Sequence, residues 1–285
     1  MKKILITGAN SYIGTSFENY IKDKFSDDYV IDTVDMIDGT WREKDFAKYD
    51  SVFHVAGIAH QKETKENADL YYKVNRDLAI DTAKKAKHDG VGQFVFLSSM
   101  SIYGMDSGII TKDTPMQPKS NYGKSKMEAE FGISDLADDT FRVCIVRPPM
   151  IYGKGCKGNF VSLEKFALKL PAFPYVKNER SMLYIDNLCE FARLMIENEE
   201  SGIFCPQNAE YTNTSAMVKK IAELHGKKIR LIKGFGWALK IMGCFTGLVK
   251  KAFGSLTYSL DLSDYKENYR VVNLEESIER TENLR

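Results

Sequence analysis

The clearest chemistry in this sequence is a phenol placed beside an amine. Tyr122 and Lys126 are four residues apart, so on a helix their side chains lie on one face. Free tyrosine has a pKa of about 10, and lowering that pKa to neutrality corresponds to about 4 kcal/mol. A neighbouring ammonium group favours the charged phenolate. The pair therefore predicts proton transfer by Tyr122 with Lys126 as its electrostatic support; the alternative is a helix-face tyrosine beside a solvated lysine.

A serine pair stands just upstream of these two residues. Ser98 and Ser99 close the apolar run that starts at Gln93, which we predict to be a strand. In α/β proteins, ligands bind beyond the carboxyl ends of the sheet strands. We therefore expect the segment from Ser99 to Gly104 to lie at the same site as Tyr122.

A glycine loop near the start is the second candidate site. Residues 7–14, Thr-Gly-Ala-Asn-Ser-Tyr-Ile-Gly, follow the first predicted strand and open the first predicted helix, as dinucleotide-binding loops do. Gly8 would make the tight turn, Gly14 would let the helix pack closely, and the helix amides would face a pyrophosphate. Ser11 replaces the usual middle glycine, and an ordinary glycine turn is the alternative. The predicted cofactor-binding residues here are Gly8, Asn10, Ser11, Tyr12, Ile13 and Gly14.

An acidic residue after the second predicted strand bears on the choice of cofactor. A carboxylate at that place normally holds the ribose hydroxyls of NAD and repels the extra phosphate of NADP. Asp35 is the best candidate, and Asp32 ranks second because a regular strand directs it to the other face. NAD is therefore expected and NADP is less favoured, although a solvated strand end remains the alternative for each aspartate.

These groups must be positioned by a parallel sheet with helices on both faces. Short β-branched runs alternate with stretches whose apolar residues recur three or four apart, which predicts a Rossmann-like doubly wound α/β fold. The pattern changes after Pro149, so we predict a dinucleotide-binding domain of residues 1–150 plus about 183–205, and a smaller substrate-binding domain of residues 151–182 and 206–285. Expected strands are 3–7, 30–35, 51–55, 93–98 and 142–147; expected helices are 13–24, 71–88 and 122–136.

The order of these motifs resembles a known family. The Thr7–Gly8 loop, the run His54-Val55-Ala56-Gly57, the Ser98–Ser99 strand end, Tyr122 with Lys126, and Arg147–Pro148 resemble the extended short-chain dehydrogenases/reductases of the NAD-dependent epimerase/dehydratase family. The resemblance implies that Ser99, Tyr122 and Lys126 are catalytic, with Ser99 holding the reacting oxygen near Tyr122. It also implies cofactor contacts by Ala56, Gly57, Asn75 and Pro148, and substrate contacts by Ser101, Asn159 and Arg180.

The resemblance further implies hydride and proton transfer at C4 of a nucleotide sugar, such as a UDP-sugar. Dehydratases of the family carry an Asp-Glu pair where this chain has Met100–Ser101, which argues against dehydration. We favour a UDP-hexose or UDP-hexosamine 4-epimerase because Asp35 favours NAD. The short chain also resembles 4-reductases that act on UDP-4-keto-6-deoxy-hexosamines in surface-polysaccharide synthesis. A non-catalytic NAD-binding regulatory protein, suggested by Ser11, is the alternative from another class.

Composition limits the other partners. A net charge of +1 offers no global attraction for nucleic acid. The five cysteines and four histidines show neither a disulfide framework nor metal-ligand spacing, so no metal is expected. No stretch approaches the roughly 20 apolar residues that cross a bilayer, so we expect a cytoplasmic chain without stable membrane insertion. The family resemblance leaves a homodimer open.

One basic stretch fits two interpretations. From Lys227 to Leu260 there are seven lysines or arginines and no acid. Apolar residues recur there at helical spacing, which is typical of a core-facing helix and, less often, of a membrane-surface helix. We favour the core. The residues of this apolar stripe are Trp237, Ile241, Phe245, Val249 and Phe253.

Overall fold

A six-stranded parallel sheet forms the centre of the molecule. The computed structural model describes residues 1–59, 61, 63–64, 66–234 and 253–282. Within them the strand order is β10-β6-β4-β3-β1-β2. The bounds are β1 Lys2–Thr7, β2 Tyr29–Val34, β3 Ser51–His54, β4 Gln93–Leu97, β6 Arg142–Val146 and β10 Gly202–Phe204.

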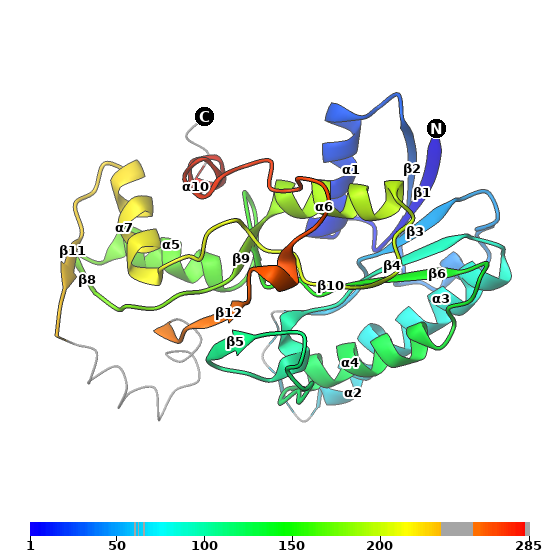
Figure 1. Cartoon of the computed structure of the whole chain (residues 1–285), viewed down its shortest axis with the longest axis horizontal. Helices are drawn as coiled ribbons and strands as arrows, with labels where there is room; N and C mark the ends of the chain where they lie inside the picture. Colours follow the sequence, from blue (N-terminus) through cyan, green and yellow to red (C-terminus); the bar gives the residue numbers. More distant parts are fainter. Residues whose placement is uncertain (60, 62, 65, 235–252, 283–285) are drawn as a thin grey trace.

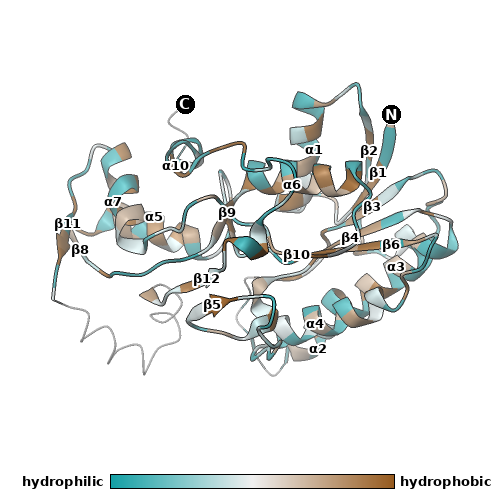
Figure 2. Cartoon of the chain, in the orientation of Figure 1, coloured by the Kyte–Doolittle hydropathy of each residue, from teal (hydrophilic) through white to brown (hydrophobic). Residues whose placement is uncertain are grey.

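Burial of both faces explains the sequence of the inner strands. All four residues of β3 and all five of β4 are buried, and both strands consist largely of β-branched and aromatic residues. In Figure 2 the central strands are correspondingly hydrophobic and the outer helix surfaces more hydrophilic. The predicted strands agree with the observed ones to within one residue at each end.

Helices cover both faces of the sheet. Figure 1 shows α1 (Tyr12–Lys24) and α6 (Ile185–Glu197) on one face, and α3 (Leu78–His88) and α4 (Asn121–Ser134) on the other. The predicted doubly wound α/β fold is therefore confirmed.

The helix predicted over residues 71–88 differs from the structure. It begins as α2 (Ala68–Tyr71), continues as a π-helical turn, η2 (Tyr72–Asp77), and only then becomes α3. A π turn adds a residue to the helical repeat and is frequent at functional sites. Here it contains the fully buried Asn75, whose amide reaches the loop after β3.

The strand order reverses between β1 and β3, which is where α/β sheets form ligand crevices. The loops that follow these two strands touch. Gly8 has φ +97°, and a Cβ on it would lie 2.9 Å from the Cα of Ala56. Only glycine suits such a position, because both the backbone angle and the contact exclude a side chain.

A second region consists of short strand pairs and helices. Figure 1 shows α5 and α7 beyond one end of the sheet, with β12 and β5 between them and α4. β10 joins the main sheet beside β6, and α6 packs on α1. The division into two domains stays a prediction. The strand pairs are β7 (Met150–Tyr152) with β9 (Met182–Tyr184), β8 (Ala172–Pro174) with β11 (Arg230–Ile232), and β5 (Gly108–Ile110) with β12 (Leu256–Tyr258). The helices are α5 (Asn159–Lys169), α7 (Thr214–Leu224) and α10 (Leu274–Thr281). The 3-10 turns of the described chain are η1 (Thr40–Arg42), η3 (Met100–Tyr103) and η4 (Asp261–Ser263).

Most of the predicted apolar stripe lies outside the described residues, namely Trp237, Ile241, Phe245 and Val249. Its last member, Phe253, packs on Phe173 with ring centroids 5.5 Å apart. Among the described residues, no helix is long and apolar enough to cross a membrane.

Candidate active site

The start of α4 places Tyr122 at the carboxyl end of β4. Ser120 caps the helix by accepting a hydrogen bond from the backbone N–H of Gly123 at 3.1 Å. The Glu63 carboxylate accepts from the N–H groups of Asn121 at 3.0 Å and Tyr122 at 3.1 Å. A carboxylate at a helix N-terminus is favourable both as a cap and against the helix dipole. The backbone of Tyr122 is therefore anchored from two sides.

Turn η3 packs closely against the start of α4, and Ser99 is the residue that precedes this turn. A Cβ on Gly123 would lie 2.7 Å from the carbonyl oxygen of Ser101, so only glycine lets the two elements approach this closely. Ser99 caps η3, and its hydroxyl also donates to the Ser101 hydroxyl at 3.1 Å. The side chain of Ser99 also acts on the Tyr122 hydroxyl, whose pKa it lowers. The two predicted catalytic hydroxyls thus lie near each other.

Lys126 lies one turn further along α4 and is buried. Its ammonium group donates to the carbonyl of Leu97 at 2.8 Å and lies 4.6 Å from the centroid of the Phe96 ring. Burial lowers the pKa of Lys126 to about 8, and the negative charge of Glu130 opposes this lowering. A substantial fraction of the amine is therefore uncharged on the alkaline side of neutrality.

The pKa of Tyr122 is raised in the protein alone. Burial is the main cause, and the nearby Ser99 side chain acts in the opposite direction. The net direction is opposite to the lowering expected from Lys126, because removal of the phenol from water disfavours its charged form. Tyr122 also packs edge-on against Tyr71, with ring centroids 6.5 Å apart.

The structure explains why Ser11 can replace a glycine in the phosphate loop. Its backbone is extended, with φ −73°, and its hydroxyl accepts from the N–H of Gly14 at 3.1 Å as the N-cap of α1. Asn10 takes the left-handed conformation, with φ 63°. The side chains of Tyr12 and Ile13 pack against the apolar core. Contact of their backbone N–H groups with a pyrophosphate stays a prediction.

The two aspartates of β2 are used differently. Asp32 accepts from the hydroxyl of Tyr49 at 2.6 Å and from the ammonium of Lys48 at 3.2 Å. Asp35, directly after the strand, is exposed and accepts from the N–H of Ile37 at 2.8 Å. Asp35 is thus the more accessible acid at this edge, and its contact with a ribose stays a prediction.

Asn75 holds the loop after β3. Its amide accepts from the N–H of Ile58 at 2.8 Å and donates to the carbonyl of the same residue at 3.1 Å. A Cβ on Gly57 would lie 2.9 Å from Oδ1 of Asn75 and 3.5 Å from Nζ of Lys126. The loop held by the π turn therefore places Gly57 beside Lys126. Pro148 contacts turn η3, where its carbonyl accepts from the N–H of Met100 at 2.9 Å.

Arg180 is a cation without an ion-pair partner in the described part of the chain. Its Nη1 donates to the carbonyl of Gly254 at 2.9 Å, and burial lowers its pKa. Asn159 is the first residue of α5 and is exposed. Among the described residues, no hydrogen bond joins Arg180 or Asn159 to the Ser99–Tyr122 pair. Their predicted contacts with substrate stay predictions.

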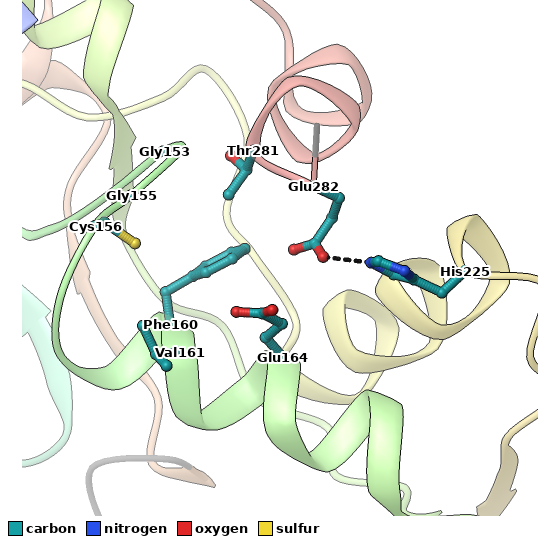
Figure 3. Close-up of a pocket in the computed structure, with 9 residues that line it drawn as sticks. All are labelled: Gly153, Gly155, Cys156, Phe160, Val161, Glu164, His225, Thr281 and Glu282. Atoms are coloured by element: carbon teal, nitrogen blue, oxygen red, sulfur yellow. Dashed lines mark hydrogen bonds and ion pairs between the residues drawn. The ribbon is translucent and has the colours of Figure 1, made fainter. Parts of the chain in front are cut away.

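The pocket in Figure 3 lies elsewhere in the second region. Its acidic lining includes Glu164 of α5 and Glu282, whose carboxylate accepts a hydrogen bond from Nε2 of His225 at 2.7 Å. Such a lining disfavours an anionic nucleotide. None of the predicted site residues lines it. The full lining is Gly153, Gly155, Cys156, Phe160, Val161, Glu164, His225, Thr281 and Glu282. Within residues 1–234 and 253–282, as far as they are described, no group of acids, histidines and cysteines could hold a metal.

Sequence reasoning missed two residues of this site. Glu63, which caps α4, comes from an irregular loop, and no spacing connects it with Tyr122. Glu130 follows Lys126 by four residues, and this helical spacing was an available signal.

Residues 4–204 match the profile of the NAD dependent epimerase/dehydratase family, which is more than two thirds of the chain. The chain belongs to this family. A member from Vibrio cholerae, a UDP-glucose 4-epimerase, is 29% identical over 296 residues, covering 93% of this chain and 89% of that protein.

Two solved structures are similar to this chain in fold. A dTDP-4-dehydrorhamnose reductase from Clostridium acetobutylicum has a TM-score of 0.77 at 20% identity and covers 99% of both chains. A UDP-glucuronic acid 4-epimerase from Bacillus cereus, in complex with NAD, has a TM-score of 0.73 at 18% identity and covers 99% of this chain and 97% of that chain. Both support the fold, at identities too low to carry a substrate.

Proposed function

We propose that this protein is an NAD-dependent 4-epimerase of a UDP-hexose or UDP-hexosamine. The observation that carries the proposal is the closeness of Ser99 and Tyr122, with Lys126 buried one helical turn further along α4. The match to a UDP-glucose 4-epimerase over most of both chains supports C4 of a UDP-sugar as the reacting position.

The residues at the sheet's switch point fit NAD. The turn from Gly8 to Gly14 opens a helix of 13 residues whose first turn carries no acid, so its N–H groups are suited to a pyrophosphate. Asp35 would take the ribose hydroxyls, and Ala56, Gly57 and Pro148 would border the nicotinamide. When bound, NAD would accept the hydride of C4, would return it to the opposite face of the keto sugar, and in its oxidised form would place a positive charge beside Tyr122.

The chain's own groups would move the proton. Tyr122 would take the proton of the sugar C4 hydroxyl, and Ser99 would hold the same oxygen by a hydrogen bond. Lys126 would favour the phenolate electrostatically. After the keto sugar has rotated in the site and presents its opposite face, Tyr122 would return the proton to the oxygen. Arg180 would grip the diphosphate with its planar guanidinium, and Asn159 and Ser101 would complete the substrate contacts.

A 4-keto-sugar reductase is the second candidate. A reductase of similar fold covers this chain almost end to end, which supports it. Purified protein should be incubated with UDP-glucose, UDP-N-acetylglucosamine and a UDP-4-keto-6-deoxy-hexosamine while the absorbance of reduced nicotinamide and the C4 configuration are followed. Conversion of configuration without net nicotinamide oxidation supports the epimerase. Stoichiometric NADH consumption with the keto sugar overturns it in favour of the reductase.

Substitution of Tyr122 tests whether the protein is an enzyme of this type at all. Tyr122→Phe removes the hydroxyl and keeps the ring, so kcat should fall by about 100-fold or more while NAD binding persists. Lys124→Met, an exposed position on the same helix, is the matched control. Unchanged turnover in Tyr122→Phe would show that another group is the base. NAD binding without turnover on any nucleotide sugar would favour the regulatory protein.

A further inference from the structure

A buried ion pair lies directly behind the Ser99–Tyr122–Lys126 group. Glu130 follows Lys126 by one turn of α4, and its carboxylate accepts from Arg147 at 3.1 Å from Nε and 2.6 Å from Nη2. Glu130 is only 2% exposed and Arg147 6%. Two opposite charges are thus removed from water and held in a bidentate geometry.

The pair connects the elements that carry the predicted catalytic groups. The hydroxyl of Ser98 donates to Glu130, which fixes the end of β4 immediately before Ser99. Nη1 of Arg147 donates to the hydroxyl of Tyr103 at 2.9 Å, which fixes turn η3. The hydroxyl of Tyr258 donates to the carbonyl of Arg147 at 2.8 Å and attaches β12 to the end of β6.

We propose that Glu130 is the positioning residue of this site: clamped by Arg147 and Ser98, its carboxylate fixes α4 against the ends of β4 and β6 and thereby sets how Ser99, Tyr122 and Lys126 meet. The inference rests on the proposed function and assigns a further residue to the same site. Stability alone does not account for the pair, because replacing a buried ion pair by apolar side chains is often neutral or stabilising.

The charges around Lys126 give the pair a second consequence. Glu130 is the acid that raises the pKa of Lys126 against the effect of burial. His54, on the neighbouring strand β3, is neutral, because burial and the nearby ammonium lower its pKa to about 3. Arg147 is balanced by Glu130, and the Tyr122 phenol is uncharged at neutral pH. Loss of the Glu130 charge should therefore make Lys126 lose its proton at lower pH.

The test compares two acids of one helix. Glu130→Gln keeps the shape of the side chain and removes its charge. Glu128→Gln is the matched control, because Glu128 is also paired with an arginine, Arg76 at 2.7 Å, but faces outward and is 38% exposed. We expect kcat of Glu130→Gln to fall by about 10- to 100-fold with KM nearly unchanged, since small misplacements of reacting groups cost this much. The alkaline limb of its kcat profile should move to lower pH, and the Glu128→Gln variant should resemble the wild type.

A folded Glu130→Gln protein that keeps wild-type kcat, or loses kcat without movement of the alkaline limb, overturns the proposal. Should this variant not fold, Glu130→Asp tests the positioning role instead, because it keeps the negative charge and shortens the side chain by one methylene group. Lowered kcat with the alkaline limb in place supports the positioning role, and wild-type kcat overturns it.

One readout does not depend on turnover. The alkaline titration of Lys126 can be followed by NMR in wild-type and Glu130→Gln protein labelled with carbon-13 at the lysine ε-position, with Lys126→Met for assignment. A midpoint at lower pH in the variant supports the inference, and an unchanged midpoint overturns it. Absence of wild-type turnover on nucleotide sugars would instead count against the proposed function alone.

Discussion

Two arginines, the buried Arg147 and the half-buried Arg180, differ in how the protein balances their positive charge. Burial alone would lower the pKa of Arg147, but Glu130 and the hydroxyl of Tyr103 raise it beyond the ordinary value. The pKa of Arg180 is lowered by burial, and no carboxylate of the described chain lies within ion-pair distance of it. One cation is neutralised within the fold and the other is not.

The contrast between Arg147 and Arg180 suggests different roles for the regions that contain them, the central sheet and the second region. A cation matched by a buried acid has its charge used inside the protein, where it fixes geometry. A desolvated cation without an acid keeps its attraction for an external anion. Lys126 resembles Arg180 in this respect, because it too is buried outside any ion pair of the described residues, although Glu130 acts on it from a distance.

The largest change in the free energy of unfolding should come from breaking the ion pair between Glu130 and Arg147. Arg147→Leu leaves the Glu130 carboxylate buried and unmatched, so we expect the free energy of unfolding to fall by about 3–5 kcal/mol. Urea unfolding followed by circular dichroism measures this. A loss below about 1 kcal/mol would show that Glu130 finds water or another partner, and the comparison between the arginines would fail.

Arg180 should show the opposite profile. Arg180→Ala removes charge-assisted hydrogen bonds to the proposed diphosphate, each about 1.5–3 kcal/mol, so KM for the UDP-sugar should rise by about 10- to 100-fold. The melting temperature should change little. Steady-state kinetics measure the first and calorimetry the second, with Arg230→Ala on the exposed face of β11 as control. Equal KM in both variants would remove Arg180 from the substrate site.

Lys126→Met should make the protein more stable while it abolishes turnover. The pKa of Lys126 falls from its ordinary value to about 8 on folding, so the unfolded chain binds more protons between these values. The cost of burying the cation is complete below pH 8 and disappears as pH rises toward the unfolded value. We expect a gain of about 1–3 kcal/mol at pH 7, less the lost bond to Leu97, that shrinks by pH 10.

Measurement of the free energy of unfolding of the wild type and Lys126→Met at several pH values checks whether the gain in stability shrinks as pH rises. A gain that is constant with pH, or a loss at pH 7, would mean that Lys126 is not an uncompensated cation in the folded protein.

The smallest effect is expected for an exposed ion pair at the start of β6, the strand that ends just before Arg147. Arg142 and Glu199 are 3.0 Å apart, with side chains 46% and 49% exposed. Arg142→Gln should change the free energy of unfolding by less than about 0.5 kcal/mol, because solvent screens the pair. Urea unfolding beside Arg147→Leu makes the contrast direct, and a loss comparable to that variant would contradict it.

The sequence was most informative where one periodicity dominated. The buried strands were found because their residues are apolar on both faces, as in β4, and the span of α4 was found from its helical spacing. The π turn around Asn75 was missed, because an inserted residue leaves the apolar spacing of the flanking helices nearly intact. The meeting of Ser99 with Tyr122 followed from strand ends sharing one edge of the sheet.

Other parts of the site depend on contacts that no spacing encodes. Glu63 reaches the start of α4 from 58 residues away along the chain, and Tyr258 reaches Arg147 from 111 residues away. The upward direction of the Tyr122 pKa was also missed, because the residues printed around Tyr122 and Lys126 show the amine but not the burial of the phenol. Residue types therefore predicted which groups would react, whereas the electrostatics of these groups required the packed molecule.

The pairing of β5 with β12 has a practical consequence for anyone who shortens this chain. A fragment that ends at residue 252 would retain every predicted catalytic and cofactor-binding residue. It would nevertheless expose one hydrogen-bonding edge of β5 and remove the hydroxyl of Tyr258 from Arg147 and the carbonyl of Gly254 from Arg180. Unpaired strand edges promote aggregation. The segment from Gly254 to Tyr258 thus holds β5, Arg147 and Arg180 in place. A minimal catalytic fragment should therefore keep every residue up to the end of α10.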